Sequence, residues 1–398
     1  MNDPVSVADR LADTPTVRDT VLAAAAAARG QGDPRAMTHA WLLTGAPGSG
    51  RSIVAQAFAS ALVCTQGLGC GGCESCRDVW AGAHTDVVHV VPEALSISVA
   101  LVRQVILQAA SLPTVAPWRI VIIEDADRLS SGAAEALLKT VEEPPERTVI
   151  LLLAPSTDPQ DFSQTLRSRC RHLYVPSPSM EEIVRILTTE EGASEADARL
   201  AASASLRHVG RARRLVRNSA AQQRRATVLN IAESIHHGDQ AFQAVSALVK
   251  AVDKEAKEGF AEEDAAEREK LELSLGRGGR GKGTARAAHG TAGAVKDLEK
   301  KQKTRQTRRK RDILDLALVD FAGVYRDALM LKTGAQVPLT HPDFEPLARE
   351  IAERSEVDGL VACQDAIARC REHLGQNVAP QIAFDGMIGR IRLALGAT

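Results

Sequence analysis

Aromatic residues are scarce in this sequence, since phenylalanine, tryptophan and tyrosine together make up 3% of its 398 residues. The core therefore has to be built from small aliphatic side chains, which favours closely packed helices. Neither sign of charge dominates, because 49 basic and 50 acidic residues leave a formal net charge of −1. This balance excludes a protein that is basic throughout, so any contact with nucleic acid must come from a local patch.

Long apolar runs are also missing. The sequence contains no continuous stretch of about 18 apolar residues, the length at which a membrane-spanning helix is predicted. Its first residues, MNDPVSVADRLAD, carry acids in place of the basic flank and apolar stretch that mark a signal peptide. We therefore expect a cytoplasmic protein with no membrane contact.

Cysteines are few, but four of the seven lie within residues 64–76. Cys64, Cys70, Cys73 and Cys76 follow the pattern C-x5-C-x2-C-x2-C, and the small residues of GCGGC permit a tight turn. In a cytosolic chain such clustering indicates a metal site more than disulfides. Four thiolates can close tetrahedrally on Zn²⁺ and leave no open position, which predicts structural zinc. Free thiols or a redox pair are the alternative.

Buried strands alternate with helices in the first half of the chain. HAWLLTG (39–45), RIVIIED (119–125) and TVILLLA (148–154) are short apolar runs typical of strands buried on both faces. SIVAQAFASALVC (52–64) and GAAEALLKTVEE (132–143) have the character of helices. Alternation of this kind predicts an α/β domain with a parallel sheet.

The segment TGAPGSGRS (44–52) has the spacing of a phosphate-binding P-loop between a strand and a helix. Its glycines would turn backbone N–H groups toward phosphate oxygens, and the serine would place a hydroxyl on Mg²⁺. An arginine replaces the usual lysine, and its planar fork is bulkier than an ammonium group. A tight turn without a ligand is the alternative. The candidate nucleotide-binding residues here are Gly45, Gly48, Gly50, Arg51 and Ser52.

Glu124 and Asp125 end the strand at 119–125 and are the candidate acids of the same site. P-loop ATPases of this kind end the strand in Asp-Glu, so the order of the two acids is reversed here. Because misplacement by about 1 Å can abolish catalysis, we expect poor hydrolysis of ATP. A solvated pair of carboxylates is the alternative interpretation.

AEALLKTVEEPPERTVILLLA (134–154), LRSRC (166–170) and the four-cysteine insert resemble the clamp-loader subunits of bacterial DNA polymerase III. Those are AAA+ proteins that open the sliding clamp and seat it on primed DNA. The resemblance covers roughly residues 36–215. Within the family, the altered loop and reversed acids are more similar to the delta-prime type than to the gamma/tau ATPase.

The resemblance implies a subunit that acts as a rigid stator, with weak or absent ATPase activity of its own. It implies that Arg169, between Ser168 and Cys170, is an arginine finger donated in trans to ATP on a neighbouring gamma/tau subunit. A surface salt bridge is the alternative for Arg169. The implied partners are gamma/tau and delta subunits in a hetero-oligomeric ring, the sliding clamp, and primer-template DNA through the complex. ATP or ADP with Mg²⁺ is a possible ligand.

A lid arginine that touches nucleotide is also implied by the resemblance. GRARRL (210–215) fits this role, with Arg213 as the best match. Arg211 and Arg214 leave the register open.

The expected architecture is an α/β AAA+ module with P-loop and zinc-binding insert, then a helical lid and an all-α C-terminal collar. The module covers residues 1–177, the lid 178–217 and the collar 218–398. A charged, Gly/Arg-rich flexible insert at about 253–299 interrupts the collar, because its composition cannot bury a core. Residues 300–311 hold eight basic side chains and are either a solvated helix face or a phosphate contact.

Two other functions are compatible with the same motifs. One is an ATP-hydrolysing AAA+ motor of the gamma/tau type, which the altered loop and reversed acids disfavour. The other is a zinc-containing DNA-binding scaffold whose P-loop is a relic. ATP turnover by the purified chain, or rescue of a partner's ATPase, distinguishes these functions from the delta-prime role.

Overall fold

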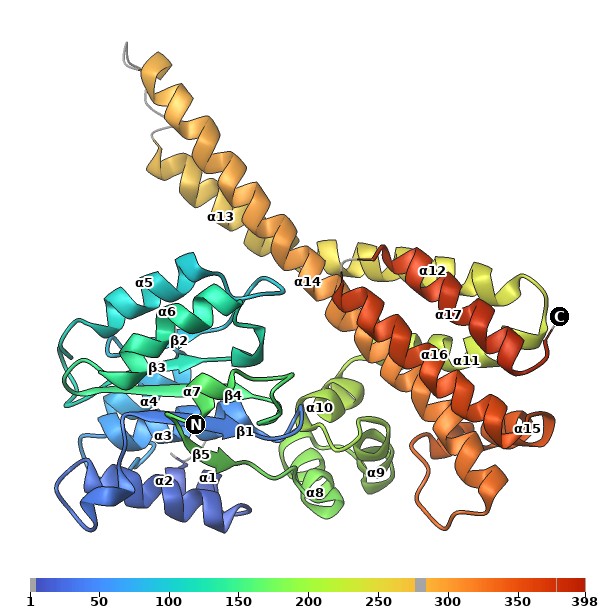
Figure 1. Ribbon diagram of the computed structural model, residues 1–398, viewed down its shortest axis with the longest axis horizontal. Helices are drawn as coiled ribbons and strands as arrows, with labels where there is room; N and C mark the ends of the chain where they lie inside the picture. Colours follow the sequence, from blue (N-terminus) through green and yellow to red (C-terminus); the bar gives the residue numbers. More distant parts are fainter. Residues whose placement is uncertain (1–4, 276–283, 377, 398) are drawn as a thin grey trace. The chain divides into compact units, whose positions relative to one another are not determined.

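The computed structural model describes residues 5–275, 284–376 and 378–397 (Figure 1). The chain forms two compact units. The first contains residues 1–186 and 207–211, and the second contains residues 187–206 and 212–398. Over the described part of the chain, no helix has both the length and the apolar character needed to cross a membrane.

A five-stranded sheet forms the centre of the first unit, with strand order β2-β3-β4-β1-β5 and every neighbouring pair parallel. The apolar runs at 39–45, 119–125 and 148–154 form three of these strands, so the predicted parallel α/β sheet is confirmed. The strands are β1 (Ala40–Thr44), β2 (Val87–Val90), β3 (Arg119–Ile123), β4 (Thr148–Ala154) and β5 (Arg171–Tyr174).

Helices cover both faces of this sheet, because successive side chains of each strand point to opposite sides. Trp41 and Leu43 pack with α1 to α4 on one face, whereas Leu42 packs with α5, α6 and α7 on the other. The helices are α1 (Val7–Arg10), α2 (Pro15–Ala27), α3 (Arg51–Val63), α4 (Glu74–Ala81), α5 (Val99–Ala109), α6 (Ser131–Glu142) and α7 (Gln164–Arg167), with short 3-10 turns η1 (Pro34–Ala36) and η2 (Ala126–Arg128).

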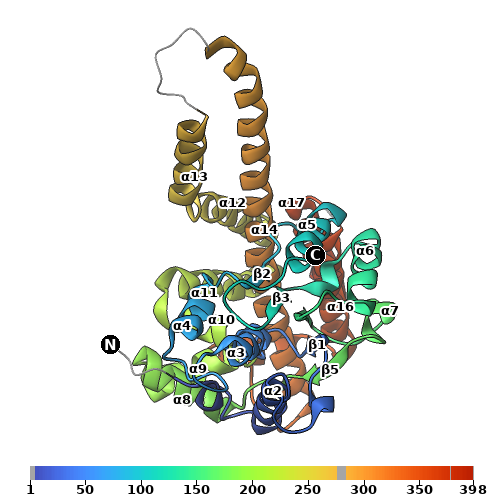
Figure 2. The same ribbon diagram turned by 90° about the vertical axis from the view of Figure 1, so that its left-hand side faces the viewer.

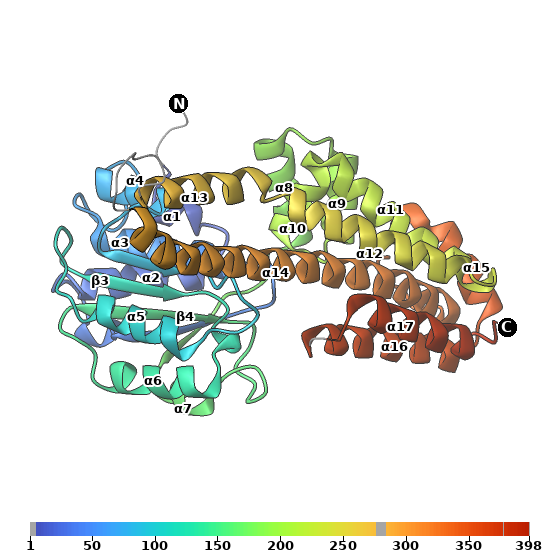
Figure 3. The same ribbon diagram turned by 90° about the horizontal axis from the view of Figure 1, so that it is seen from above.

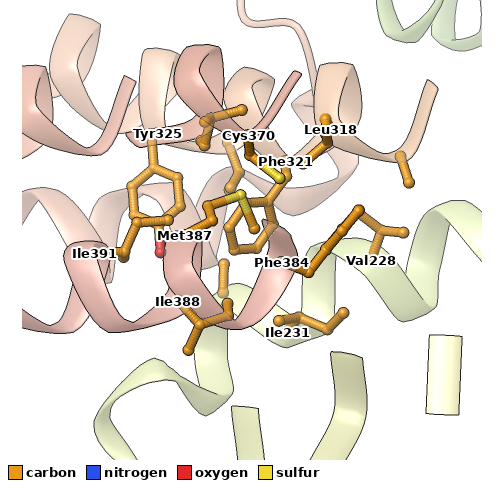
Figure 4. Close-up of a cluster of buried hydrophobic side chains, with 14 of the residues drawn as sticks. Val228, Ile231, Leu318, Phe321, Tyr325, Cys370, Phe384, Met387, Ile388 and Ile391 are labelled. Carbon is orange, nitrogen blue, oxygen red and sulfur yellow. The ribbon is translucent and has the colours of Figure 1, made fainter. Parts of the chain in front are cut away.

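The secondary structure described for the second unit is entirely helical, and its core is formed by α11, α12, α14, α15, α16 and α17. Figure 4 shows Phe321 and Tyr325 of α14 packed among Phe384, Met387 and Ile388 of α17. Helices α8 (Met180–Glu191) and α10 (Val209–Arg217) each contain residues of both units. The others are α9 (Glu195–Ala204), α11 (Ser219–Glu233), α12 (Gln240–Glu258), α13 (Ala261–Ser274), α14 (Thr284–Thr333), α15 (Glu345–Arg354), α16 (Val357–Gly375) and α17 (Pro380–Ala394), with η3 (Ser234–His236) and η4 (Pro342–Phe344).

Helix α13 lies antiparallel beside α14 (Figures 2 and 3), and we call α13 with the part of α14 before Ile313 the helical arm. Arg305 of α14 bonds three carboxylates of α13, and Arg268 of α13 pairs with Glu299 of α14. These ion pairs account for a difference from the sequence expectation. A flexible insert was expected at about 253–299, but its described residues are mostly helical, while 276–283 lie outside the described residues.

A buried histidine fixes the loop after α14 in the second unit. His341 is 1% exposed, its backbone N–H donates to Asp327, and its Nε2 lies 3.0 Å from the carbonyl of Asp320. Its Nδ1 faces a guanidinium nitrogen of Arg225 at 2.9 Å. The ring is therefore a neutral acceptor at Nδ1, since a proton there would face Arg225. Burial, reinforced by the Arg225 charge, lowers the pKa of His341 to about 4.

We expect the second unit to lose stability as the pH falls from about 7 to 5. The unfolded chain binds a proton at His341 near pH 6.5, whereas the folded chain binds it only near pH 4. This difference lowers the free energy of unfolding by about 2 kcal/mol over that range. Urea unfolding followed by circular dichroism measures the effect, which His341→Gln should remove. His237→Gln, at an exposed position of the same unit, should leave the pH dependence as it is in the wild type.

Candidate functional site

The four cysteines of the insert lie together at the end of α3 and the start of α4. Their sulfur atoms all lie within 4.8 Å of one another, and the sulfurs of Cys64 and Cys73 are 3.9 Å apart. Zn–S bonds of about 2.3 Å in a tetrahedron require sulfur separations of about 3.8 Å. This cluster therefore fits a metal ion held by Cys64, Cys70, Cys73 and Cys76.

Backbone N–H groups surround the sulfurs and favour their charged form. The N–H of Cys70 points to the sulfur of Cys64 at 3.4 Å, and that of Cys76 points to Cys73 at 3.5 Å. Burial opposes ionisation of Cys73, but N–H groups of Thr65 and Cys76 outweigh it and lower the pKa of Cys73 to about 6. Burial raises the pKa of Cys76 to about 12. Thiolates are the form that binds Zn²⁺.

The cysteine loop also anchors the N-terminal segment. The N–H of Val7 donates to the carbonyl of Gly69 at 2.8 Å. Gly69 and Gly71 have positive φ, and a Cβ at either would lie 2.2–2.3 Å from Val7 or Val5. Only glycine fits both requirements. Because α1 packs directly on this loop, a metal there would hold α1, α3 and α4 together.

A glycine loop (residues 45–50) joins β1 to α3 at the carboxyl edge of the sheet. Gly48 and Gly50 adopt φ of 87° and 90°, values that side-chain-bearing residues rarely adopt. A Cβ at Gly45 would lie 2.2 Å from the carbonyl oxygen of Val175. The predicted strand, glycine turn and helix are therefore present in order, with α3 beginning at Arg51.

The side chain of Arg51 is folded back on its own loop. Its Nη1 donates to the carbonyl of Gly45 at 2.9 Å. Burial lowers the pKa of Arg51, while the charges of Asp125, Asp127 and Glu124 oppose that shift. The guanidinium of Arg51 therefore lies against the backbone of the loop and close to these three carboxylates.

Ser52 and Glu124 are joined by a hydrogen bond. The Ser52 hydroxyl donates to Glu124 Oε2 at 2.8 Å, and the other carboxylate oxygen lies 3.0 Å from His89 Nε2. Asp125 follows at the end of β3 with a positive φ of 48°. The hydroxyl expected to face Mg²⁺ is therefore already bonded within the protein. His89 was not singled out from the sequence, because only strand pairing brings β2 beside the end of β3.

His208 packs against the glycine loop within the first unit. A Cβ at Gly48 would lie 2.3 Å from the His208 ring and 2.6 Å from its Cα. The preceding Arg207 has a positive φ of 62°. Sequence reasoning missed His208, and no local pattern marks it.

Arg169 lies at the surface just after α7. Its side chain is 36% exposed and pairs with Glu142 at the end of α6. The guanidinium also donates to the Thr165 carbonyl at 3.0 Å and to the Ser168 hydroxyl at 3.1 Å. These contacts hold the charged group in one orientation while leaving part of it open to solvent.

Arg213 belongs to the second unit, where it pairs with Glu190 and Glu191 of α8. Arg214 lies in the same unit and Arg211 in the first, so the register of the lid arginine stays open. Around the glycine loop the first unit brings together seven predicted residues. They are Gly45, Gly48, Gly50, Arg51, Ser52, Glu124 and Asp125.

Comparison with known proteins relates the first part of the chain to replication proteins. Residues 29–179 match the family described as "DNA polymerase III, delta subunit". DNA polymerase III subunit delta' of Yersinia pestis is 41% identical over 145 residues, which are 35% of this chain and 42% of that protein. The Bacillus subtilis delta' subunit is 31% identical over 202 residues, covering 50% of this chain and 60% of that protein.

Gamma/tau subunits also match part of the chain. The tau/gamma subunit of Haemophilus influenzae is 33% identical over 172 residues, covering 42% of this chain and 24% of that protein. The chain spans about half the length of the delta' relatives it matches. The resemblance predicted from the sequence is confirmed by these similarities.

Proposed function

We propose that this chain, a relative of DNA polymerase III delta-prime subunits, is the delta-prime-like subunit of a clamp loader. It acts as a stator in a ring with gamma/tau and delta subunits, and the ring opens the sliding clamp and loads it on primed DNA. Residues 1–177 are its AAA+ domain, 178–217 its lid and 218–398 its collar. The observation that carries the proposal is the family match at residues 29–179, joined to a glycine loop beside which Arg51 donates to the carbonyl of Gly45 and Ser52 donates to Glu124.

Weak or absent ATP hydrolysis is part of this proposal. Arg51 donates to Gly45 instead of extending from the loop, and Ser52 donates to Glu124. A bound nucleotide with Mg²⁺ would have to replace both hydrogen bonds and accommodate His208 against Gly48. Each replacement reduces the net gain on binding, because an existing hydrogen bond, with a net contribution of about 1 kcal/mol, has to be given up for the new one.

The purified chain should hydrolyse ATP at least about 100-fold more slowly than the 1 s⁻¹ at the low end of ordinary enzymes. Arg51→Lys should tighten nucleotide binding about fivefold, since a lysine is a flexible point charge that suits phosphate. Equilibrium binding of a fluorescent ATP analogue and phosphate release measure the two effects. Arg103→Lys, at an exposed position of α5, is the matched control and should change neither. Turnover near 1 s⁻¹ by the wild type would instead favour the gamma/tau-type motor.

The proposal also assigns an active role to Arg169, as an arginine donated in trans to the ATP site of a neighbouring subunit. Arg169 is exposed, oriented by Glu142 and Thr165, and is the second arginine of the Leu-Arg-Ser-Arg-Cys motif at residues 166–170. An arginine supplied by a neighbour stabilises the charge that develops on a transferring phosphoryl group. The function as a whole is tested by reconstituting the chain with gamma/tau, delta, clamp and primed DNA. We expect clamp loading and full ATPase only when this chain is present.

Structural zinc completes the proposed role. The ligands are Cys64, Cys70, Cys73 and Cys76, whose sulfur spacing and N–H donors suit a closed tetrahedral site. A zinc ion held by four thiolates supplies folding stability and no reactive position. The scaffold alternative, a zinc-containing DNA-binding protein, predicts DNA binding without any effect on a partner's ATPase.

A further inference from the structure

The helical arm carries a row of positive side chains along one side of α14. At 100° per residue, the five positions fall within a sector of roughly 100° and extend over about 22 Å of helix. The first three side chains are exposed, and the last two are partly buried. We call this row the α14 stripe. It consists of Lys296, Lys300, Lys303, Lys310 and Arg311.

One end of the α14 stripe lines a cleft in the second unit. The cleft has a volume of about 520 Å³ and lies among α12, α14 and the residues just before α17. Lys303, Lys310 and Arg311 line it from α14, and Lys257 adds a fourth cation from α12. The volume is within the range of ordinary ligand sites.

Two carboxylates also line the cleft, and each already has a cationic partner. Asp253 accepts from Lys257 at 2.7 Å and from Lys310 at 2.8 Å, which fixes both ammonium groups at the cleft. Glu299 pairs with Arg268 of α13. The lining therefore holds four cations and two acids, and Asp253 fixes two of the four cations, Lys257 and Lys310.

The acids of α13 do not neutralise the α14 stripe. Three of them, Glu263, Asp264 and Glu267, converge on Arg305, whose side chain is only 10% exposed. Arg305 lies on a different side of α14 from the stripe, as its position in the helical repeat requires. Among the described residues, no carboxylate lies within ion-pair distance of Lys300 or Lys303.

We propose that the α14 stripe and its cleft bind the phosphate backbone of a nucleic-acid strand. Cations repeated along a straight helix match a chain of phosphates, and lysines bind phosphates as point charges. The cleft has no aromatic side chain in its lining, so binding would be independent of base sequence. A protein partner is disfavoured for the same reason, because protein interfaces are enriched in aromatic anchors. This contact is separate from the glycine loop and from Arg169.

Fluorescence anisotropy with the full chain tests the proposal, using labelled single-stranded and duplex oligonucleotides in separate titrations. We expect binding at about 50 mM salt that weakens steeply toward 200 mM, as counterion release requires. The variant Lys300→Glu/Lys303→Glu should lose about tenfold in affinity. For binding of a single strand by this variant, the slope of log K against log salt should be shallower by about 1.4, because two phosphate contacts are lost. The oligonucleotide that binds with the higher affinity identifies whether the surface prefers a single strand or a duplex.

The matched control is Lys250→Glu/Lys332→Glu, which makes the same charge change at exposed positions of α12 and α14. Lys332 lies about 30 Å along α14 beyond Arg311. Equal affinities of the two double variants, or no binding by the wild type at low salt, would overturn the proposal. Displacement of DNA by polyglutamate at equal charge concentration would assign the surface to acidic protein instead. The affinity for oligonucleotides is measured with the chain by itself, so failure of the proposed clamp-loading function would not change the outcome of this test.

Discussion

Replacing Arg169 by alanine is expected to lower the ATPase rate of the neighbouring gamma/tau site by about 100- to 1,000-fold in the reconstituted clamp loader. The guanidinium would stabilise charge that appears on the phosphoryl group during transfer, so its loss affects the rate more than nucleotide binding. Pre-steady-state phosphate release from the assembled complex measures the rate, and a nucleotide titration separates it from affinity. Arg169→Lys should recover little activity, because a lysine lacks the planar fork.

Arg167 provides the control for this experiment. It lies two residues earlier, is exposed, and donates from its guanidinium to the side-chain oxygen of Gln164 at 3.3 Å. Arg167→Ala should leave the ATPase rate within about twofold of the wild type, since exposed side chains of this kind contribute little. Size-exclusion chromatography establishes that each variant still enters the complex. An unchanged rate in a complete complex with Arg169→Ala would exclude the trans role.

Removal of the metal is expected to destabilise the first unit by about 5 kcal/mol or more, because zinc binding to four cysteines is itself a large folding term. The three tryptophans, Trp41, Trp80 and Trp118, all lie in this unit and report its unfolding by fluorescence. Arg10 of α1 stacks on the ring of Trp80 in α4 at 4.2 Å, so the fluorescence of Trp80 reports on the region that loss of the metal should destabilise. The measurements are metal content by mass spectrometry and thermal unfolding with and without a chelator.

Cys73→Ala should abolish stoichiometric zinc and reproduce the effect of the chelator. Cys363→Ala makes the same chemical change at a buried position of the second unit. It should retain zinc and leave the tryptophan-reported transition in place. A wild-type protein without bound metal, or one whose unfolding is insensitive to chelation, would contradict the zinc assignment.

Much of the first unit follows from local sequence patterns. Short apolar runs predicted β1, β3 and β4, and the carboxyl ends of parallel strands meet at one edge of a sheet. That rule alone predicts that Ser52 and Glu124 lie close together, as their 2.8 Å hydrogen bond shows. The cysteine spacing likewise predicts the cluster, since the short chain segment between Cys64 and Cys76 keeps the four side chains close together.

Contacts between distant segments were not predictable in the same way. His89 reaches Glu124 only because β2 pairs with β3, and His208 reaches Gly48 through a turn with positive φ. The helical order of α13 and of the described residues of α14 before Lys300 was not predicted, because low hydrophobicity usually predicts flexibility. Its order depends on opposite charges some 40 residues apart in sequence, such as Arg305 and Glu263. The roles of Arg169 and Arg213 stay predictions, since both depend on a neighbouring subunit or a ligand.

Helix α14 has a mechanical consequence. It runs without interruption from Thr284 to Thr333, about 75 Å at 1.5 Å per residue. The α14 stripe occupies residues 296–311 around its middle, and Phe321 and Tyr325 nearer its C-terminal end are embedded in the helical core. A force applied by a nucleic-acid strand bound at the lysines would therefore be passed to the packed aromatic rings along one continuous helix.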